Sequence, residues 1–270
     1  MPIIPLKCPN CGASLNANSE DEILVCKHCW INSVMKDAIV ANYITNGVTI
    51  NSDNATIVNQ DKDFVIKDGC LTRYNGEEID VVIPDNVREI GKKAFEYNRY
   101  IRSVRMSDNV IDIDDGAFAG CKALTSVHLS NRLETIGSKA FLLCSGLPSM
   151  NLPDTLTYIG DDAFGCCESL KSINIPSGIE RITDCCFSDC TSMKNVNLPM
   201  GLRTIGERAF AGCGFDEIHL PDTVEKVGEN AFPQKIVEKW KRLRVCRHCG
   251  GEFKGVFKKV CVRCHTEKDY

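Results

Sequence analysis

Large apolar residues recur along most of this chain with a period of 23 residues. Phenylalanine marks the period best, because it returns at this interval, except that the last interval is 22. The seven positions are Phe95, Phe118, Phe141, Phe164, Phe187, Phe210 and Phe232. Their neighbours recur as well, as Ile136-Gly137 and Ala140-Phe141 show for one unit. A period this long exceeds that of a helix or a strand, so the pattern predicts a solenoid of stacked repeats.

Within each unit, apolar and polar residues alternate over a few positions. Val127 and Leu129 would point to one face of a short strand, while Ser126, His128 and Ser130 would point to the other. A proline directly after this stretch marks the end of the strand in four units, namely Pro153, Pro176, Pro199 and Pro221. The glycine of the Ile-Gly step indicates a bend. We therefore expect one strand per unit and an irregular convex side, because no segment between strands is long enough for a full helix.

Both ends of the repeat array carry patterns that are typical of caps. Before it, strands are predicted at 64–67, 70–74 and 79–83, and the pairs Asp68-Gly69 and Asn75-Gly76 favour tight primed turns between them. After it, a stripe of four apolar residues predicts a capping helix over 233–245. The stripe consists of Ile236, Val237, Trp240 and Leu243.

The repeat has the form Cys-x-x-Leu-x-x-Val/Ile-x-Leu-Pro-x-x-Leu-x-x-Ile-Gly-x-x-Ala-Phe over residues 81–232. This pattern resembles the BspA-like class of bacterial leucine-rich repeats. The resemblance implies a leucine-rich repeat solenoid of seven repeats, rich in β-strand, with an irregular convex side. It also implies a recognition scaffold of a kind often found in surface or adhesion proteins.

The composition of the chain indicates a large core and a cellular location. The 270 residues are 43% hydrophobic and 25% charged, which is enough apolar material for a large core. No apolar run approaches membrane-spanning length, and no basic start precedes an apolar stretch, so we expect a cytoplasmic protein. Thiols stay reduced there, so the 17 cysteines are interpreted first as metal ligands or core residues, before disulfides.

Eight cysteines at the two ends of the chain have the spacing of metal ligands. Each end holds two Cys-x-x-Cys pairs, namely Cys8, Cys11, Cys26 and Cys29, and Cys246, Cys249, Cys261 and Cys264. Two such pairs supply the four thiolates that structural zinc prefers. Both sets resemble zinc ribbons, so we expect two structural zinc ions, in ribbons over 1–33 and 246–270. A closed four-cysteine site has no open position for substrate, which argues against metal catalysis.

Five other cysteines keep the 23-residue period instead. Cys121, Cys144, Cys167, Cys190 and Cys213 each follow a repeat phenylalanine by three residues. We expect this column to be buried, with each thiol donating a weak hydrogen bond to a loop carbonyl. A redox or metal column is the less favoured alternative.

Charge divides the chain into two parts. Residues 235–264 contain ten Lys and Arg against two Glu, a net +8 in a chain whose total is −4. This segment is either a solvated or intramolecular partner of the acidic remainder, which we favour, or a nucleic-acid contact. The domain order is a ribbon over 1–33, a β-prone connector over 34–60, a hairpin cap over 61–83, the solenoid over 84–232, the helix and the second ribbon.

The outward positions of the predicted strands form the one extended polar surface. One column of it consists of Arg105, His128, Asn151, Asn174, Asn197 and His219. The column predicts either a ligand site on the concave face or an amide ladder among the asparagines. His128 and His219 are four units apart, about 19 Å at strand spacing, so they cannot share a proton. The sequence thus favours a non-enzymatic scaffold for a protein or peptide, with nucleic-acid binding by the C-terminal segment or a surface adhesin as alternatives.

Overall fold

The computed structural model describes residues 63–240 in full, and outside this range only the backbone of residues 241–242 and of several short strands. The chain divides into two compact units, Met1–Asp63 and Phe64–Tyr270. The eight predicted zinc ligands lie outside the residues described in full. The first unit contains three antiparallel strand pairs, which are β1 (Leu6–Lys7) with β2 (Ser14–Leu15), β3 (Ile23–Val25) with β4 (Asn32–Met35), and β5 (Val48–Ile50) with β6 (Ile57–Asn59).

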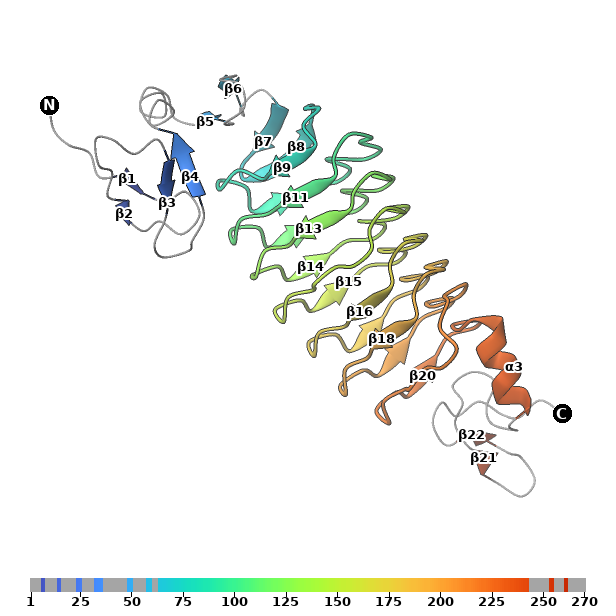
Figure 1. Ribbon diagram of the computed structural model, residues 1–270. Helices are drawn as coiled ribbons and strands as arrows, with labels where there is room; N and C mark the ends of the chain where they lie inside the picture. The colour runs from blue at the N-terminus through green and yellow to red at the C-terminus, as the bar shows by residue number, and fades with distance from the viewer. Residues whose placement is uncertain are drawn as a thin grey trace, which may run out of the picture. The chain divides into compact units, whose positions relative to one another are not determined.

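In the second unit, most repeats contribute two short strands, which form two rows of parallel strands along the stack (Figure 1). We call these rows the first and the second sheet, although the pairing is interrupted once in each, between β13 and β16 and between β15 and β17. The first sheet contains the predicted strands β9 (Asp80–Val82), β11 (Ser103–Arg105), β13 (Ser126–His128), β16 (Ser172–Asn174) and β18 (Asn195–Asn197). The second sheet contains β8 (Cys70–Tyr74), β10 (Glu89–Ile90), β12 (Asp112–Ile113), β14 (Thr135–Ile136), β15 (Tyr158–Ile159), β17 (Arg181–Ile182), β19 (Thr204–Ile205) and β20 (Lys226–Val227).

The second sheet corrects the expectation of one strand per unit. Its inward residue is the isoleucine of the Ile-Gly step, and Ile136 is fully buried. The glycine that follows continues the hydrogen bonding of the second sheet, because Gly137 N–H donates to Ile113 O at 2.7 Å and Gly160 N–H to Ile136 O at 2.8 Å. A Cβ on Gly160 would lie 2.4 Å from the backbone nitrogen of Ser138. At Gly160 the absence of a side chain therefore allows the close approach of two backbones rather than a bend. Asp114 holds the equivalent position in another repeat and donates to Ile90 O at 2.8 Å.

A third ladder of hydrogen bonds, which we call the turn ladder, runs through the turns that hold the repeat phenylalanines. At one joint, meaning the contact between two neighbouring repeats, Gly116 N–H donates to Ser138 O, Phe118 N–H to Ala140 O and Gly120 N–H to Leu142 O, at 2.7–2.9 Å. Every bond of this ladder points from an N–H of one repeat to a carbonyl of the next. The first and last donors of each turn have positive φ, even where they are not glycine, as in Leu143 (φ 61). The strain of roughly 1–2 kcal/mol per residue is borne because the turn is bonded to its neighbours.

The core is a column of phenylalanine rings between aromatic caps. From Phe95 to Phe210 neighbouring ring centroids are 4.8–5.5 Å apart and their planes lie within 12° of each other. Tyr74 covers one end of the column at 5.0 Å, and Trp240 meets Phe232 edge-on at 5.2 Å at the other. Each such pair adds about 0.5–1.5 kcal/mol beyond the burial of its area.

The cap elements lie where the sequence predicts them, but one pairing differs. Strand β7 (Phe64–Lys67) pairs antiparallel with β8 through a turn in which Asp68 and Gly69 both have positive φ, as in a type I′ turn. The expectation of a second primed turn at Asn75-Gly76 is wrong. Strand β8 joins the second sheet and β9 the first, so these two strands do not pair, and the largely exposed segment between them leads from one sheet to the other. Helix α3 (Gln234–Arg242) buries Ile236 and half-buries Val237 and Trp240.

Candidate functional site

The outward side chains of the first sheet form a continuous polar surface, which we call the strand face. It includes all six residues of the predicted column, and each of them is exposed. Arg105 lies directly beside His128 in the register of β11 and β13, and Asn174 lies beside Asn197 in that of β16 and β18. The residues between them in sequence, such as Val104 and Ile173, point into the core. The predicted alternation therefore holds within the strands and brings these side chains together in rows. The expectation that Ser130 points outward is wrong, because Ser130 is fully buried just after β13.

The first sheet is interrupted at the middle of this row. In neighbouring repeats, Thr125 N–H donates to Arg102 O and Lys171 N–H to Pro148 O. Pro148 occupies the same position and has no N–H to donate, so the segment 149–151 keeps only an isolated bridge between Ser149 and Ser172. Asn151 is thus exposed on the strand face but outside a regular strand.

The asparagines of the row do not form the amide ladder that was one interpretation of the column. Within residues 63–240, no hydrogen bond joins the side chains of Asn151, Asn174 and Asn197. Elsewhere on the face, polar side chains do pair across repeats, since Ser103 Oγ donates to an oxygen of Asp80 at 2.5 Å. The amide groups are therefore available to a ligand, and each amide carries both donors and an acceptor.

The last repeat opens the strand face into a groove. The shortening of the repeat to 22 residues falls between Cys213 and Phe215, because Phe215 fills the core position that Met193 fills one repeat earlier. Residues 217–219, which follow, form no strand and do not pair with β18. Beside β18 lies a groove of about 420 Å³ that includes Asn197, Met200 and His219.

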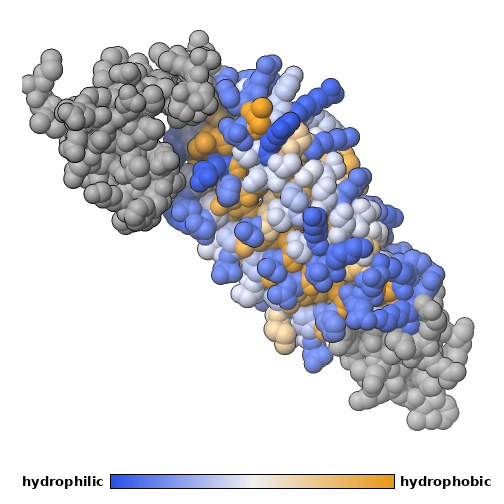
Figure 2. Space-filling model, viewed as in Figure 1, coloured by the Kyte–Doolittle hydropathy of each residue, from blue (hydrophilic) through white to orange (hydrophobic). Residues whose placement is uncertain are grey.

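The groove combines polar and apolar walls. Asn195, Asn197 and His219 present hydrogen-bonding groups, while Leu198, Ile218 and Leu220 are only partly covered. The side chain of Met200 is 74% exposed, the highest value among the exposed large apolar residues of the described range. Apolar side chains also come to the surface between polar ones on the face seen in Figure 2. A site of this kind is suited to a side chain with both apolar and polar parts.

Acidic residues beside the groove pair with helix α3. Lys235 Nζ lies 2.6 Å from Asp216 Oδ1, and Lys239 Nζ lies 2.6 Å from Glu217 Oε1. These hydrogen bonds and charges lower the pKa of both carboxyl groups. Lys194 and Lys235 also donate to the carbonyl of Gly214, at 3.1 and 3.0 Å. At least two lysines of the basic segment are therefore partners of acidic groups in the same chain, which supports the intramolecular interpretation of its charge.

The cysteine column is structural, as the sequence predicts. Cys121 Sγ donates to Phe95 O at 3.1 Å, and the same bond recurs in the next four repeats at 3.1–3.2 Å. Burial raises the pKa of the Cys121 thiol to about 12, and it also raises the pKa of Cys144 and Cys167 well above the ordinary value. Thiols held in this way are poor nucleophiles.

The half-buried cysteines carry no sign of activation either. Burial is the largest cause of a raised pKa in Cys70, Cys166 and Cys185, and nearby carboxylates raise it further. Within the described range, no group of three or more His, Cys, Asp or Glu could hold a metal ion. That range also contains no helix long and apolar enough to cross a membrane.

Sequence reasoning predicted the strand face but missed the groove. Nothing in the composition of residues 195–222 indicates a cavity. The available signal was the 22-residue interval between Phe210 and Phe232. A missing residue just before a strand shifts that strand against its neighbour, and this consequence could have been drawn from the sequence.

Two solved structures of leucine-rich repeat proteins resemble the chain. One is a leucine-rich repeat protein of T. pallidum, 30% identical, covering 67% of this chain and 94% of its own length, with a TM-score of 0.59. The other is a leucine rich cell surface protein of Faecalibacterium prausnitzii A2-165, 31% identical, with a TM-score of 0.59. The match covers 72% of this chain but only 52% of that protein.

No curated protein matches the chain. The family model for the BspA type leucine rich repeat region matches six copies over residues 65–192 and 113–238. These matches span most of the part that the structure describes in full, including both sheets and the phenylalanine column. The chain is a member of the BspA-type leucine-rich repeat family.

Proposed function

We propose that this protein is a non-enzymatic scaffold that binds a protein or peptide on the strand face. The observation that carries the proposal is the row of exposed polar side chains, which is in register from Arg105 to His128 and from Asn174 to Asn197 and leads into the groove beside β18. The family supports a binding role, because leucine-rich repeat proteins generally mediate protein–protein interactions. The ligand residues are Arg105, His128, Asn151, Asn174, Asn197 and His219.

An extended peptide is the partner that fits this surface best. Adjacent strands place the row residues at about 4.8 Å intervals, which gives a regular series of short polar contacts along the stack. The groove then supplies a pocket for one larger side chain, with Met200 and Ile218 as apolar wall and Asn197 and His219 as polar wall. A few such anchored side chains dominate the affinity of most interfaces.

The test begins with the selection of peptide ligands. A random peptide library is displayed and selected on the purified full chain, and the selected peptides are measured by calorimetry. The triple variant Asn151→Ala, Asn174→Ala and Asn197→Ala should weaken binding at least tenfold, and Met200→Ala should weaken it less. Because all four side chains are exposed, neither variant should change the unfolding midpoint.

A matched control lies on the second sheet. Tyr158 and Lys226 are exposed there, on the other side of the core from the strand face, so Tyr158→Ala with Lys226→Ala should leave binding unchanged. Unaltered affinity of every selected peptide for the triple variant would exclude the strand face as the site.

A role at the cell surface is a second candidate. It is suggested by the relative from Faecalibacterium prausnitzii, which is described as a leucine rich cell surface protein. The cytoplasmic location that we favour rests on the number of cysteines, which stay reduced in that compartment. Fractionation of the producing cell, with a surface protease applied to intact cells, separates the two. Protein found only in the soluble fraction and resistant to the protease would rule out the surface role.

Two structural zinc ions complete the proposal. Their ligands would be the two sets of four cysteines at the chain ends, held as thiolates in closed tetrahedral sites. Elemental analysis of the purified full chain should give two zinc ions per molecule, and Cys11→Ser or Cys249→Ser should each remove one. A chain that contains no zinc after purification without chelators would contradict this part of the proposal.

A further inference from the structure

The turn ladder ends abruptly at the last repeat. Three of its bonds cross each of the first five joints, and two cross the sixth. At that sixth joint, Arg208 N–H donates to Glu229 O at 2.9 Å and Phe210 N–H to Ala231 O at 2.8 Å. Because every bond points toward the next repeat, the last turn has donors but no repeat to receive them.

Three backbone donors are left over at this end. They belong to Gly212, Asn230 and Phe232, and within the described residues their N–H groups have no acceptor. The register would assign the carbonyl of Pro233 to Gly212. Helix α3 uses that carbonyl instead, because Ile236 N–H donates to it at 2.9 Å and Val237 N–H at 3.3 Å. A backbone N–H without an acceptor can donate a hydrogen bond to a ligand.

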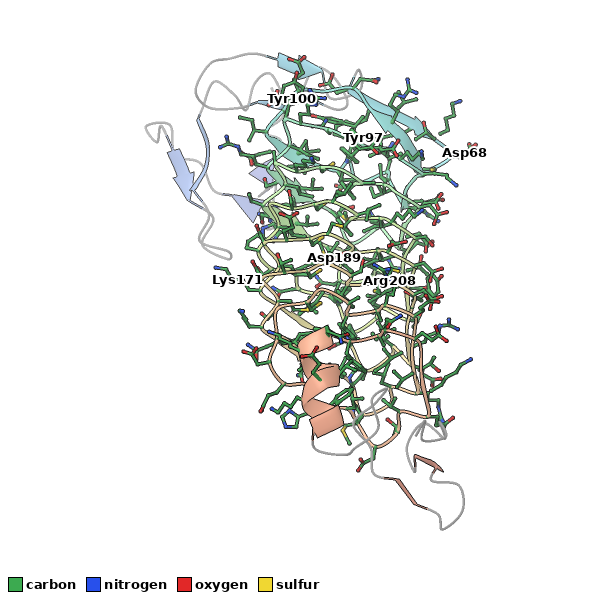
Figure 3. The ribbon with its side chains drawn as sticks, turned by 90° about the vertical axis from the view of Figure 1, so that its right-hand side faces the viewer. Asp68, Tyr97, Tyr100, Lys171, Asp189 and Arg208 are labelled. Carbon is green, nitrogen blue, oxygen red and sulfur yellow. The ribbon has the colours of Figure 1, made fainter. Side chains whose placement is uncertain are left out.

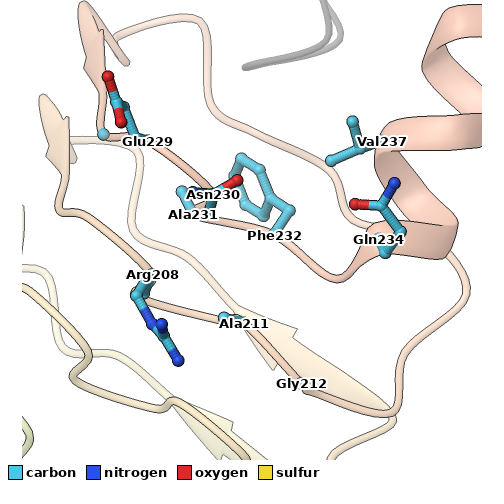
Figure 4. A pocket seen from close by; sticks show the side chains of 10 residues that line it. Arg208, Ala211, Gly212, Glu229, Asn230, Ala231, Phe232, Gln234 and Val237 are labelled. Atoms are coloured by element: carbon cyan, nitrogen blue, oxygen red, sulfur yellow. The ribbon is translucent and has the colours of Figure 1, made fainter.

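The three residues line one cavity. It has a volume of about 590 Å³ and lies between the last turn and the start of helix α3 (Figure 4). Arg208, Glu229 and Gln234 also line it, so that charges of both signs border the row of donors. The volume is in the range of sites that hold small ligands or a short stretch of peptide, about 300–1,000 Å³.

We propose that this cavity binds a peptide segment of a partner protein in the turn conformation of the repeats, whose main-chain carbonyls accept hydrogen bonds from Asn230 and Phe232, with Gly212 in the wall of the cavity. The cavity continues an interface that is already repeated along the chain, in which carbonyls two residues apart meet the donors. The carboxylate of Glu229 disfavours a free anion, whereas neutral carbonyl groups suit the donors. This site is separate from the strand face and does not depend on it.

A second copy of the chain does not fit as a continuation of the stack. At the opposite end, the carbonyl of Ala94 already accepts from Tyr74 N–H at 2.9 Å, and the β7–β8 hairpin covers the first repeat. At this end, Trp240 of helix α3 lies against the ring of Phe232. A peptide that supplies carbonyl groups but no large ring needs neither an uncovered first repeat nor the displacement of Trp240.

The probe is a blocked peptide with the sequence of residues 206–212, in which alanine replaces Phe210. In the chain, this segment supplies the carbonyls of Glu207, Ala209 and Ala211 to the preceding repeat at 2.7–2.8 Å. Alanine is used because Trp240 fills the place of the ring. A control peptide has D-alanine at the positions of Ala209 and Ala211, which keeps the composition but not the backbone conformation.

Amide signals of the isotope-labelled full chain report the binding. The probe should shift the signals of Gly212, Asn230 and Phe232 saturably, at millimolar concentration or below, and the control peptide should not. The signals of Cys185, Phe187 and Asp189 serve as an internal control, because their N–H groups are bonded within the stack. The absence of a saturable shift at the three end amides would overturn the proposal.

A variant that narrows the cavity makes the test specific. Ala211 lines it, and the equivalent position of another repeat holds Leu142, so Ala211→Leu should fold normally. It should weaken binding of the probe at least tenfold, and equal binding would contradict the site.

Hydrogen exchange of the free chain shows whether something other than a partner peptide occupies the cavity. Protection of the three end amides in the free monomer shows that the chain itself fills the cavity, and protection that grows with protein concentration shows that a second copy does. Either result would overturn the proposal of a peptide partner.

Discussion

Two adjacent joints of this solenoid differ in the first sheet, which is present at one joint and absent at the other. Between β16 and β18 the register is complete, and Ile175 N–H donates to Asn197 O at 3.0 Å. Between β18 and residues 217–219 the sheet is lost, although the second sheet continues from β19 to β20. The turn ladder also continues there, with two of its three bonds. A single missing residue before the strand accounts for the difference, because it displaces that strand while the later parts of the repeat keep their register.

The comparison shows where a repeat protein can bind. A regular joint uses its backbone groups within the stack and offers a ligand only side chains. The last joint has free backbone groups and two cavities, one beside β18 and one beside helix α3. Figure 3 shows the regular joints from another side, with Lys171 projecting away from the stack and Asp189 and Arg208 in the turns. Binding sites are thus expected where the period fails, while stability resides where it holds.

The largest effect should come from the regular part of the core. Phe164 is fully buried between two stacked rings, so Phe164→Ala should lower the free energy of unfolding by about 3–5 kcal/mol. Phe232 stacks on one ring only, with Trp240 at its other side, and helix α3 can settle into the space. Phe232→Ala should therefore cost less. Urea unfolding measures both, and an equal or larger loss for Phe232→Ala would refute this contrast between centre and end.

The cysteine column should make the stability of the stack depend on pH. The folded chain holds the proton of Cys121 up to a pKa of about 12, whereas the unfolded thiol loses it near 9. The contribution is therefore complete below pH 9 and declines as the pH rises toward 12, by at most about 1.4 kcal/mol per pH unit for one thiol. The urea midpoint of Cys121→Ala should fall less steeply between pH 8.5 and 10.5. Parallel curves for the two proteins would show that this thiol does not contribute.

These results show what the sequence could reveal. The 23-residue period placed the phenylalanine column and the buried thiols, because side chains that recur must stack on one another. It did not reveal the second sheet, because a stretch of two residues, such as Thr135-Ile136, is too short to show an alternating pattern. The free donors of Asn230 and Phe232 could not be predicted, since they depend on how the last turn meets helix α3. The zinc sites stay a prediction.

Restoring the missing residue should remove the difference between the two joints. Insertion of one threonine after Cys213 returns the last interval to 23 and copies Cys190-Thr191 of the preceding repeat. We expect residues near Glu217 to pair with β18 and the groove to close. Peptides selected on the strand face should then bind about tenfold more weakly, or about 1.4 kcal/mol, and hydrogen exchange of Val196 and Leu198 should slow. Unchanged exchange and affinity would show that the length of this repeat does not create the groove.

The smallest effect is expected at the interruption within the regular part. Pro148→Thr supplies the N–H that the carbonyl of Thr125 lacks, and one hydrogen bond is worth about 0.5–1.5 kcal/mol. Loss of the proline also frees the unfolded chain, which opposes folding by about 0.4–1 kcal/mol. The two terms nearly cancel, so the unfolding midpoint should change little. Hydrogen exchange gives the clearer result, because the new amide at position 148 should be protected and exchange at Asn151 should slow if the sheet becomes continuous. Slow exchange at Asn151 in the unaltered chain would show that the sheet is already closed there and that the proline does not interrupt it.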